Sequence, residues 1–407
     1  MNTSLLVKIN CKSRDEKPIL MTEFIDNDIQ TYDGENNSVI CIEELNELIK
    51  NPYTRSQTVV FRNSLNKKLQ GSCIEEAYEN YIPMADSLKE HLGGKFNFYK
   101  CGSVKKMSLY KFFNSTKAVQ PEEIKATEAQ WINDSSHGAL MYWEAYKGEV
   151  HEYDVNIRYP HVMQKNQHYF PIREGEYKTI DEIDTSLAVE YGLYKCSITK
   201  HDDKPYKLFR FNPKNSYTHL DIKVAIKYGL KIEMIMNGQP NFLYYSKDKL
   251  MNGAYLFKNF VDELYELKQQ KVNGAKDILN TLWGALSETN HFNHSIETDK
   301  ETHIDDANIT RINCDDNINI RCTYYNKKEF KTNWGRIKPF VLSYARCQMF
   351  WSFQQFEKYI VYMHTDGFLL KDGSHDLKLS DALGGLKLEG VFNVNIIGFN
   401  KKNKTKK

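Results

Sequence analysis

The fold is decided by two stretches of sequence, YDVNIRYPHVM at residues 153–163 and YMHTDGF at residues 362–368. Each places one aspartate among strand-forming residues. Asp154 lies within an expected strand, and Asp366 lies at the tip of an expected apolar β-hairpin. We expect Asp366-Gly367 to form the turn of that hairpin, because Asp-Gly favours tight two-residue turns.

A carboxylate between apolar strands is costly to bury unless it binds a positively charged partner. Asp154 and Asp366 are distant in sequence, but they could meet on adjacent strands of one sheet. Two carboxylates in that position have the geometry that holds a pair of Mg²⁺ ions for phosphoryl transfer. The alternative is that each aspartate only caps a turn.

The composition is that of an ordinary globular protein. Its 407 residues are 41% hydrophobic and 27% charged. The length alone predicts two or three domains. The net charge of +2 neither indicates nor excludes nucleic acid, so any basic surface must be local. The 8 cysteines form no C-x-x-C pair, which argues against a zinc site and for a reducing compartment. We expect a cytoplasmic location and no membrane partner, because no signal peptide or long apolar run is present.

Helical periodicity alternates with short strand-like runs along the chain, which predicts a mixture of helices and strands. A helical hairpin is expected over residues 256–287, with a break near Asn273-Gly274. Single helices are expected at residues 42–49, 75–92, 126–133, 217–228 and 338–358.

Three local strings resemble the motifs of family B DNA polymerases. Residues 153–163 resemble motif A, D-x-x-S-L-Y-P, and residues 362–368 resemble motif C, Y-x-D-T-D-S. Between them KDILNTLWG, residues 276–284, resembles motif B, K-x-x-x-N-S-x-Y-G. The three occur in the family's order, and the interval between A and B leaves room for the insertion of the protein-primed branch. The resemblance covers about residues 108–390.

The resemblance implies an α+β fold, in which an antiparallel palm sheet is flanked by helices and joined to helical fingers and a small α/β N-terminal domain. The boundaries that it implies are a truncated or degenerate exonuclease-like domain at 1–110, palm with an insertion after motif A at 111–250, a fingers helical hairpin with motif B at 251–287, a second insertion at 288–335, palm with motif C at 336–398, and a basic tail at 399–407.

The activity implied is template-directed DNA synthesis, in which dNTPs are transferred to a primer hydroxyl with two Mg²⁺ ions as cofactor. By the family's pattern, Asp154 and Asp366 would be the catalytic carboxylates and would bind the metals together with the Val155 carbonyl. The residues implied for nucleotide binding are Tyr159, Lys268, Lys276, Asn280, Trp283 and Gly284. The residues implied to support the site or the primer terminus are His364, Thr365, Lys387 and Glu389.

These roles have physical reasons. A ring at Tyr159 under the sugar would leave no space for a 2′-hydroxyl, the group that distinguishes RNA from DNA. Lys276 and Asn280 are four residues apart, so both would project from one helix face. Trp283 would stack on the nascent base pair. For Lys268, a solvated surface lysine is the alternative reading.

The sequence also departs from the family pattern. Ile157 and Arg158 replace the Ser-Leu of motif A, and His364 replaces the first aspartate of motif C. Gly367 replaces the serine of motif C, whereas the second aspartate is kept as Asp366. The two-carboxylate pair is therefore preserved and its neighbours are altered.

The length leaves little room for a full exonuclease domain or a thumb, so we expect no proofreading and low processivity. We expect the basic tail at 399–407 to be a solvated, disordered terminus, with salt-sensitive phosphate contact as the alternative. Expected partners are a DNA template-primer and dNTPs, with a terminal-protein primer or a chain supplying thumb or exonuclease as further candidates. If the source is a virus, the location is the host cytoplasm or a virus factory.

Two other functions stay open from the sequence. The first is a degenerate or split polymerase that acts as a DNA-binding or terminal-protein-binding module. The second is a two-metal nuclease that uses the same carboxylates. Motif B argues against a nuclease, because a nuclease has no use for triphosphate-binding residues such as Lys276 and Asn280.

Overall fold

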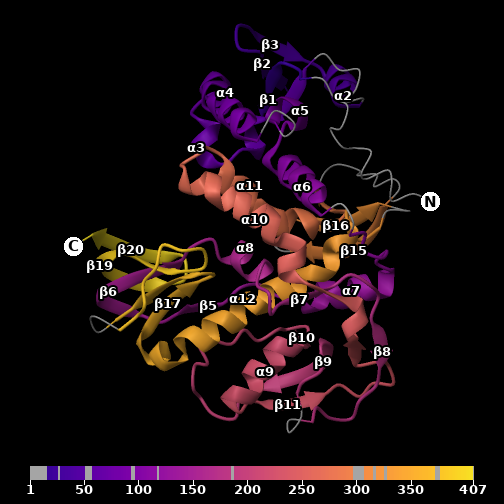
Figure 1. The fold of residues 1–407 in the computed structure, drawn as a ribbon, viewed down its shortest axis with the longest axis vertical. Coiled ribbons are helices and arrows are strands. Elements are labelled where there is room, and N and C mark those ends of the chain that lie inside the picture. Colours follow the sequence, from indigo (N-terminus) through magenta and orange to yellow (C-terminus); the bar gives the residue numbers. More distant parts are fainter. Residues whose placement is uncertain are drawn as a thin grey trace. The chain divides into compact units, whose positions relative to one another are not determined.

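The computed structural model contains helices together with mostly antiparallel sheets, so the expected mixed α+β class is confirmed (Figure 1). Contacts divide the chain into two compact units, which are described separately. The first unit comprises residues 1–118 and 257–285, and the second comprises residues 119–256 and 286–407. The residues that the structure describes are 16–25, 28–50, 57–92, 97–116, 119–184, 188–296, 307–314, 318–324, 328–371 and 376–406.

The first unit begins with a four-stranded sheet in the order β3-β2-β1-β4. Strands β1 to β3 form an antiparallel meander, and β4 runs parallel to β1. The strands are β1 (Ile19–Ile25), β2 (Asp28–Tyr32), β3 (Asn37–Ile40) and β4 (Thr58–Phe61). The N-terminal helices of this unit are α2 (Ile42–Lys50), α3 (Lys67–Gln70), α4 (Ile74–His91), α5 (Phe98–Cys101) and α6 (Val104–Ser115).

The expected helical hairpin is confirmed as α10 (Gly253–Gln269) and α11 (Ala275–Leu286). Most of it packs within the first unit, which the sequence did not predict. The Phe112 ring of α6 stacks on the Phe257 ring of α10 with centroids 5.3 Å apart. The Ser108 hydroxyl donates to the Ile278 carbonyl of α11 at 2.8 Å. The hairpin and the N-terminal helices thus share one core.

The second unit is built on a six-stranded sheet in the order β20-β19-β6-β18-β17-β5. Every pairing in this sheet is antiparallel. Its strands are β5 (Met141–Trp143), β6 (Tyr146–Val155), β17 (Ile360–His364), β18 (Gly367–Leu370), β19 (Leu386–Gly398) and β20 (Lys401–Lys406).

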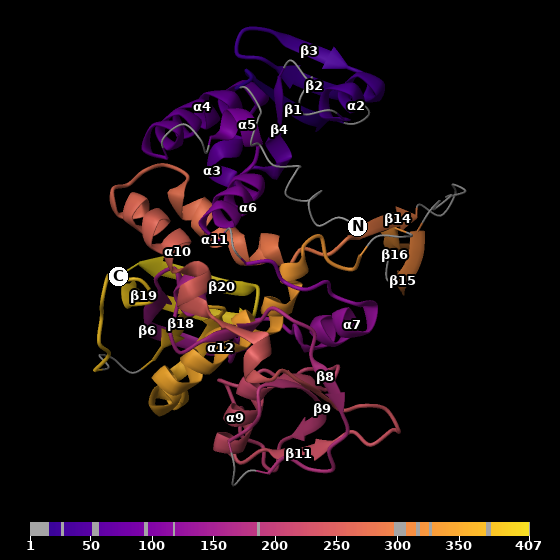
Figure 2. The ribbon, with the colours of Figure 1, turned by 45° about the vertical axis from the view of Figure 1, so that its right-hand side comes forward.

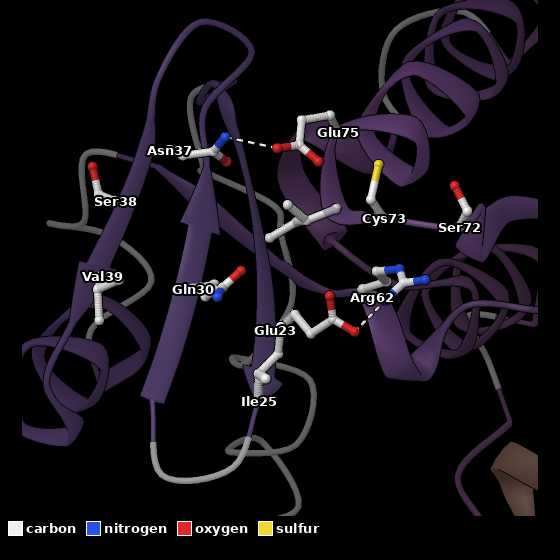
Figure 3. Close-up of a pocket in the computed structure, with 11 residues that line it drawn as sticks. Glu23, Ile25, Gln30, Asn37, Ser38, Val39, Arg62, Ser72, Cys73 and Glu75 are labelled. Carbon is white, nitrogen blue, oxygen red and sulfur yellow. Dashed lines mark hydrogen bonds and ion pairs between the residues drawn. The ribbon is translucent and has the colours of Figure 1, made fainter.

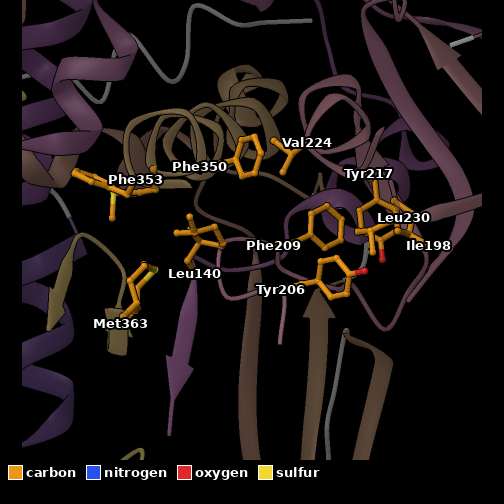
Figure 4. Packing of buried hydrophobic residues seen from close by; sticks show 14 of the residues in the cluster. Leu140, Ile198, Tyr206, Phe209, Tyr217, Val224, Leu230, Phe350, Phe353 and Met363 are labelled. Atoms are coloured by element: carbon orange, nitrogen blue, oxygen red, sulfur yellow. The ribbon is translucent and has the colours of Figure 1, made fainter. Parts of the chain in front are cut away.

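Helix α12 (Ile337–Phe353) covers one face of this sheet. Its Phe350 and Phe353 belong to one buried cluster with Met363 of β17 (Figure 4). Phe368 of β18 is part of the same cluster. The opposite face carries a second buried apolar cluster that includes Val150, Leu369 and Val394. The short helix α8 (Arg158–Met163) follows β6 directly.

An inserted region follows α8 and forms its own sheet in the order β10-β9-β12-β8, with β11 paired to β9. Figure 2 shows α9 beside this sheet. A capping box between Thr218 and Asp221 begins α9, and Gly229 ends it in the left-handed region at φ 70°. The elements are β8 (Glu176–Lys178), β9 (Gly192–Thr199), β10 (Ser216–Thr218), α9 (His219–Tyr228), β11 (Lys231–Met234) and β12 (Phe242–Tyr244).

The second unit also contains helix α7 and two small sheets. One sheet has the order β13-β7, and the other has the order β14-β16-β15. Residues 288–335, expected as an insertion, contain the second of these sheets. The bounds are α7 (Ala126–Ser135), β7 (Tyr169–Pro171), β13 (Leu250–Asn252), β14 (His291–Ile296), β15 (Ala307–Cys314) and β16 (Ile318–Tyr324). Within the described residues, no helix is long and apolar enough to cross a membrane.

The expectation of a disordered basic tail was wrong for residues 401–406, which form edge strand β20 paired with β19. The strand has no apolar periodicity, so its own sequence does not predict it. Backbone pairing and lysine stems hold it in place. The Lys402 and Lys404 amines lie 3.7 Å from the ring centroids of Tyr362 and Phe392, respectively.

Candidate active site

The two aspartates singled out from the sequence lie at the same end of the six-stranded sheet, Asp154 on β6 and Asp366 in the turn before β18. Strands β6 and β18 pair antiparallel with Gly367 directly opposite Asp154. A β-carbon at Gly367 would lie 3.5 Å from Asp154 Oδ1, so the carboxylate reaches toward the hairpin. Asp366 immediately precedes Gly367, and both aspartates are partly exposed. Asp154 thus lies on a strand opposite the residue after Asp366, whereas Asp366 itself lies in the turn that precedes β18.

The hairpin turn lies one residue earlier than expected. His364 pairs with Gly367, so Thr365 and Asp366 are the turn residues and Gly367 begins β18. Thr365 has φ 63°, in the left-handed region that a β-branched residue rarely adopts. Its amide donates to the Leu140 carbonyl at 3.0 Å, which helps to hold this conformation.

The backbone after Asp154 is fixed by a loop that precedes β19. The Asn156 amide donates to the Gly385 carbonyl at 2.9 Å, and the Gly384 amide donates to the Asn156 carbonyl at 2.7 Å. The Asn156 side-chain amide donates to the carbonyls of Asp381 and Ala382 at 2.9 and 3.1 Å. Four hydrogen bonds therefore hold the residue two positions after Asp154.

Helix α8 brings two motif A side chains to the site. Tyr159 is largely buried, and burial raises the pKa of its hydroxyl. Arg158 is only 2% exposed, and its guanidinium donates to the Thr365 carbonyl at 2.5 Å and to the Ala345 carbonyl. The sequence marked Arg158 only as a departure, because its acceptors are backbone carbonyls that no residue type identifies.

A row of lysines shares a face of the sheet with Asp154. Lys387 of β19 pairs directly opposite Asp154, on the side away from β18. Residues 402, 404 and 406 of β20 project to this same face, because they pair with β19 residues that continue the alternation. Lys404 forms an ion pair with Glu152, which is two residues before Asp154.

The other two supporting residues predicted near the site are exposed. Glu389 occupies the β-bulge of β19 between Leu388 and Gly390. His364 ends β17, and its ring lies 5.4 Å from the Phe399 ring. Neither residue has a hydrogen bond that ties it to the aspartates among the contacts described.

The residues predicted for nucleotide binding, apart from Tyr159, lie on α10 and α11. Lys276, Asn280 and Gly284 are all exposed and follow at intervals of four, so they form one open face of α11. Space beside Gly284 is open, with no atom within 4 Å of a β-carbon built there. Trp283 is half-buried next to this face. On α10, the Lys268 amine lies 5.1 Å from the Tyr265 ring centroid.

The donor atoms at the aspartate pair suit magnesium. Mg²⁺ prefers oxygen ligands and is commonly held by one or two carboxylates plus substrate phosphates. Asp154 and Asp366 provide two carboxylates, and the backbone of Val155 adjoins the first. Across the described ranges, no group of three or more His, Cys, Asp or Glu side chains is placed to hold a metal. The oxygen atoms present at the pair are those of two carboxylates and a neighbouring backbone carbonyl.

A cavity of about 560 Å³ in the first unit lies between the sheet and the start of α4 (Figure 3). Its charged groups already have partners. Arg62 forms an ion pair with Glu23 and donates to the Gln70 carbonyl at 2.7 Å, and Asn37 donates to Glu75 at 2.6 Å. These internal contacts make the cavity a weaker candidate than the aspartate pair.

Comparison with solved structures finds this fold in a DNA polymerase. Phi29 DNA polymerase complexed with single-stranded DNA aligns with a TM-score of 0.56 and 15% identity, over 96% of this chain and 73% of that chain. Its complex with primer-template DNA and incoming nucleotides aligns with a TM-score of 0.51 and 15% identity, over 94% and 72% of the two chains. Neither the family models nor the curated proteins compared with the chain match it. The resemblance expected from the sequence is thus confirmed for the fold.

Proposed function

We propose that the chain is a template-directed DNA polymerase, which transfers deoxynucleotides to a primer hydroxyl in a reaction that depends on Mg²⁺. The observation that carries this proposal is the pairing of Asp154 with Gly367, which brings Asp154 beside Asp366. The fold supports it, because the structures of similar fold are of a polymerase bound to DNA and nucleotides.

In this proposal the six-stranded sheet would be the palm, and Asp154 and Asp366 would hold two Mg²⁺ ions together with the Val155 carbonyl. Bound Mg²⁺ would lower the pKa of the primer hydroxyl and offset charge on the triphosphate. Tyr159 would pack against the sugar and exclude a 2′-hydroxyl. The turn at Thr365 would hold Asp366 at the reacting end of the sheet.

The lysine-bearing face of the sheet would hold the duplex by its phosphates. Lys387, Lys404 and Lys406 share that face with Asp154, so a duplex entering the site would pass over them. Phosphate contacts by lysine are independent of sequence and weaken as salt rises. The basic tail, expected to be disordered, would then contact DNA phosphates through the ordered strand β20.

The hairpin of α10 and α11 would be the fingers. Lys276 would contact triphosphate oxygens, with Lys268 as a second phosphate contact. Asn280 and Trp283 would line the nascent base pair. The open space beside Gly284 would let the base pair approach the helix backbone. The first unit's N-terminal part would be an exonuclease-like body without proofreading. A terminal protein or a partner chain would take part in priming.

Single-nucleotide incorporation tests the proposal. Four primed templates that differ only in the next template base are each incubated with one dNTP and Mg²⁺ at low salt. We expect extension only where the dNTP is complementary, loss of extension in Asp154→Asn, and normal extension in Asp203→Asn, which changes an exposed carboxylate. Shortening of the primer that depends on Asp154 would favour the nuclease instead. Template binding without extension would favour the binding module.

A further inference from the structure

Arg158 is the buried cation nearest to the proposed catalytic pair in sequence, four residues after Asp154. It is the first residue of α8, and the preceding Ile157 lies in the left-handed region at φ 52° and ψ 52°. This bend turns the chain from β6 into the helix and directs the Arg158 side chain inward, where it is 2% exposed. A guanidinium is rarely buried so completely unless it forms hydrogen bonds or an ion pair.

The partners of Arg158 are backbone carbonyls on two other elements. One terminal nitrogen donates to the Thr365 carbonyl at 2.5 Å, and the other donates to the Ala345 carbonyl of α12. Thr365 is the strained turn residue, and its amide is held at the same time by the Leu140 carbonyl. Thr365, the residue before Asp366, is therefore held at both of its backbone polar groups, its amide by the Leu140 carbonyl and its carbonyl by the Arg158 guanidinium.

The charge of Arg158 also acts on the aspartates. Burial lowers the pKa of its guanidinium to about 10, while Asp366 and Asp154 are close enough to stabilise the charged form. The group therefore stays protonated at neutral pH. A fixed positive charge next to two carboxylates reduces their mutual repulsion and also opposes an incoming cation.

We propose that Arg158 is a positioning residue of the catalytic pair, which fastens the turn that carries Asp366 and weakens the intrinsic affinity of the pair for divalent metal. This inference rests on the proposed polymerase function. It assigns to one side chain two separable effects, one through its hydrogen bonds and one through its charge.

Two substitutions separate these effects. Arg158→Leu removes the hydrogen bonds and the charge together, whereas Arg158→Lys keeps the charge but cannot span both carbonyls. Arg336→Lys is the control, because Arg336 is also fully buried and donates to two carbonyls, those of Glu122 and Glu123, while its charge is paired with the buried Glu128 carboxylate at 2.6 Å. Its loss should affect stability without touching the aspartates.

The measurements are Mn²⁺ binding to the free protein, followed by electron paramagnetic resonance, and the rate of primer extension at saturating Mg²⁺. We expect Arg158→Leu to bind Mn²⁺ at least about threefold more tightly, because a repulsive charge is gone. We expect both Arg158 variants to extend primers about tenfold or more slowly, because small displacements of reacting groups are costly. Arg158→Lys should bind Mn²⁺ as the wild type does, and Arg336→Lys should match the wild type in both measurements.

Unchanged Mn²⁺ affinity and extension rate in folded Arg158→Leu would overturn the inference, as would weaker Mn²⁺ binding. If Arg158→Leu does not fold, a wild-type extension rate in Arg158→Lys would overturn it in the same way. Failure of the proposed function looks different, because the wild-type protein would then neither extend primers nor lose Mn²⁺ binding in Asp366→Asn.

Discussion

Replacing Gly384 by alanine should damage the loop that fixes the backbone after Asp154. Gly384 has φ 74°, a conformation that glycine adopts freely and alanine does not. A β-carbon built there would overlap the imidazole ring of His161 on α8. The Gly384 amide also donates to the Asn156 carbonyl at 2.7 Å, so any shift of the loop pulls on Asn156.

The magnitude follows from two additive costs. Placing alanine in the left-handed region costs about 1–2 kcal/mol. Overpacking against His161 costs about 1–3 kcal/mol more, because that ring sits in a partly buried site and must move. The sum is about 2–5 kcal/mol, a large share of the roughly 5–15 kcal/mol that stabilises a typical domain.

Gly238 is the matched control. It has φ 78°, and no atom lies within 4 Å of a β-carbon built there, so Gly238→Ala carries only the conformational cost. Urea unfolding followed by circular dichroism should show the larger loss of stability in Gly384→Ala, and only that variant should lose primer extension. Equal unfolding midpoints for the two variants would refute the packing of His161 against this loop.

Three further changes have defined outcomes. The Arg346 guanidinium donates to the buried Asp221 carboxylate at 2.8–3.0 Å. Arg346→Met should destabilise the protein by about 3–5 kcal/mol, because it leaves that carboxylate as an unpaired buried charge. Urea unfolding should show that adding Asp221→Asn recovers part of the loss. Burial, aided by nearby positive charge, lowers the pKa values of His137 and His219 to about 3, so the unfolded state binds more protons between about pH 3 and 6.5. The free energy of unfolding should therefore fall on acidification through that range by up to about 1.4 kcal/mol per pH unit for each histidine, and His219→Phe should reduce the slope. Tyr159→Ala should raise ribonucleotide incorporation relative to deoxynucleotide incorporation in competition assays, whereas an unchanged ratio would remove the proposed role of that ring.

The parts of the fold that the sequence predicted are those with local signals. The periodicity of residues 217–228 and 338–358 identified α9 and α12, because an apolar face repeats every three to four residues. The apolar hairpin around Asp366 was also readable, since two short strands flank a turn. Its turn was misplaced by one residue because Asp-Gly is a strong turn signal and Thr365 is not.

Other features depend on contacts that no local pattern encodes. Strand β20 consists of lysine, asparagine and threonine, and it forms because β19 offers an edge and because Lys402 and Lys404 lie over aromatic rings. The packing of α10 and α11 with the N-terminal helices rests on pairs such as Phe112 and Phe257, which are far apart in sequence. Tertiary contacts of this kind override local propensity.

At the aspartate pair, too, some features were predictable from the sequence and others depend on tertiary contacts. The sequence indicated that Asp154 and Asp366 could meet on adjacent strands, and the pairing of β6 with β18 places Asp154 opposite Gly367, the residue after Asp366. The contacts that hold the two residues were not predictable from the sequence, because the side chains of Arg158 and Asn156 donate to backbone carbonyls and Leu140 accepts through its own backbone carbonyl. A backbone carbonyl looks the same at every position of a sequence.

Primer extension by the wild type and by Asp366→Asn, with template binding measured on the same preparations, tests the central claim most directly. The assay uses a short primed template, Mg²⁺ and all four dNTPs at low salt, where phosphate contacts are strongest. The account predicts that the wild type extends the primer, and that Asp366→Asn binds the template equally well without extending it. Equal extension by both proteins, or none by either with intact template binding, would contradict the assignment of the aspartate pair as a polymerase site.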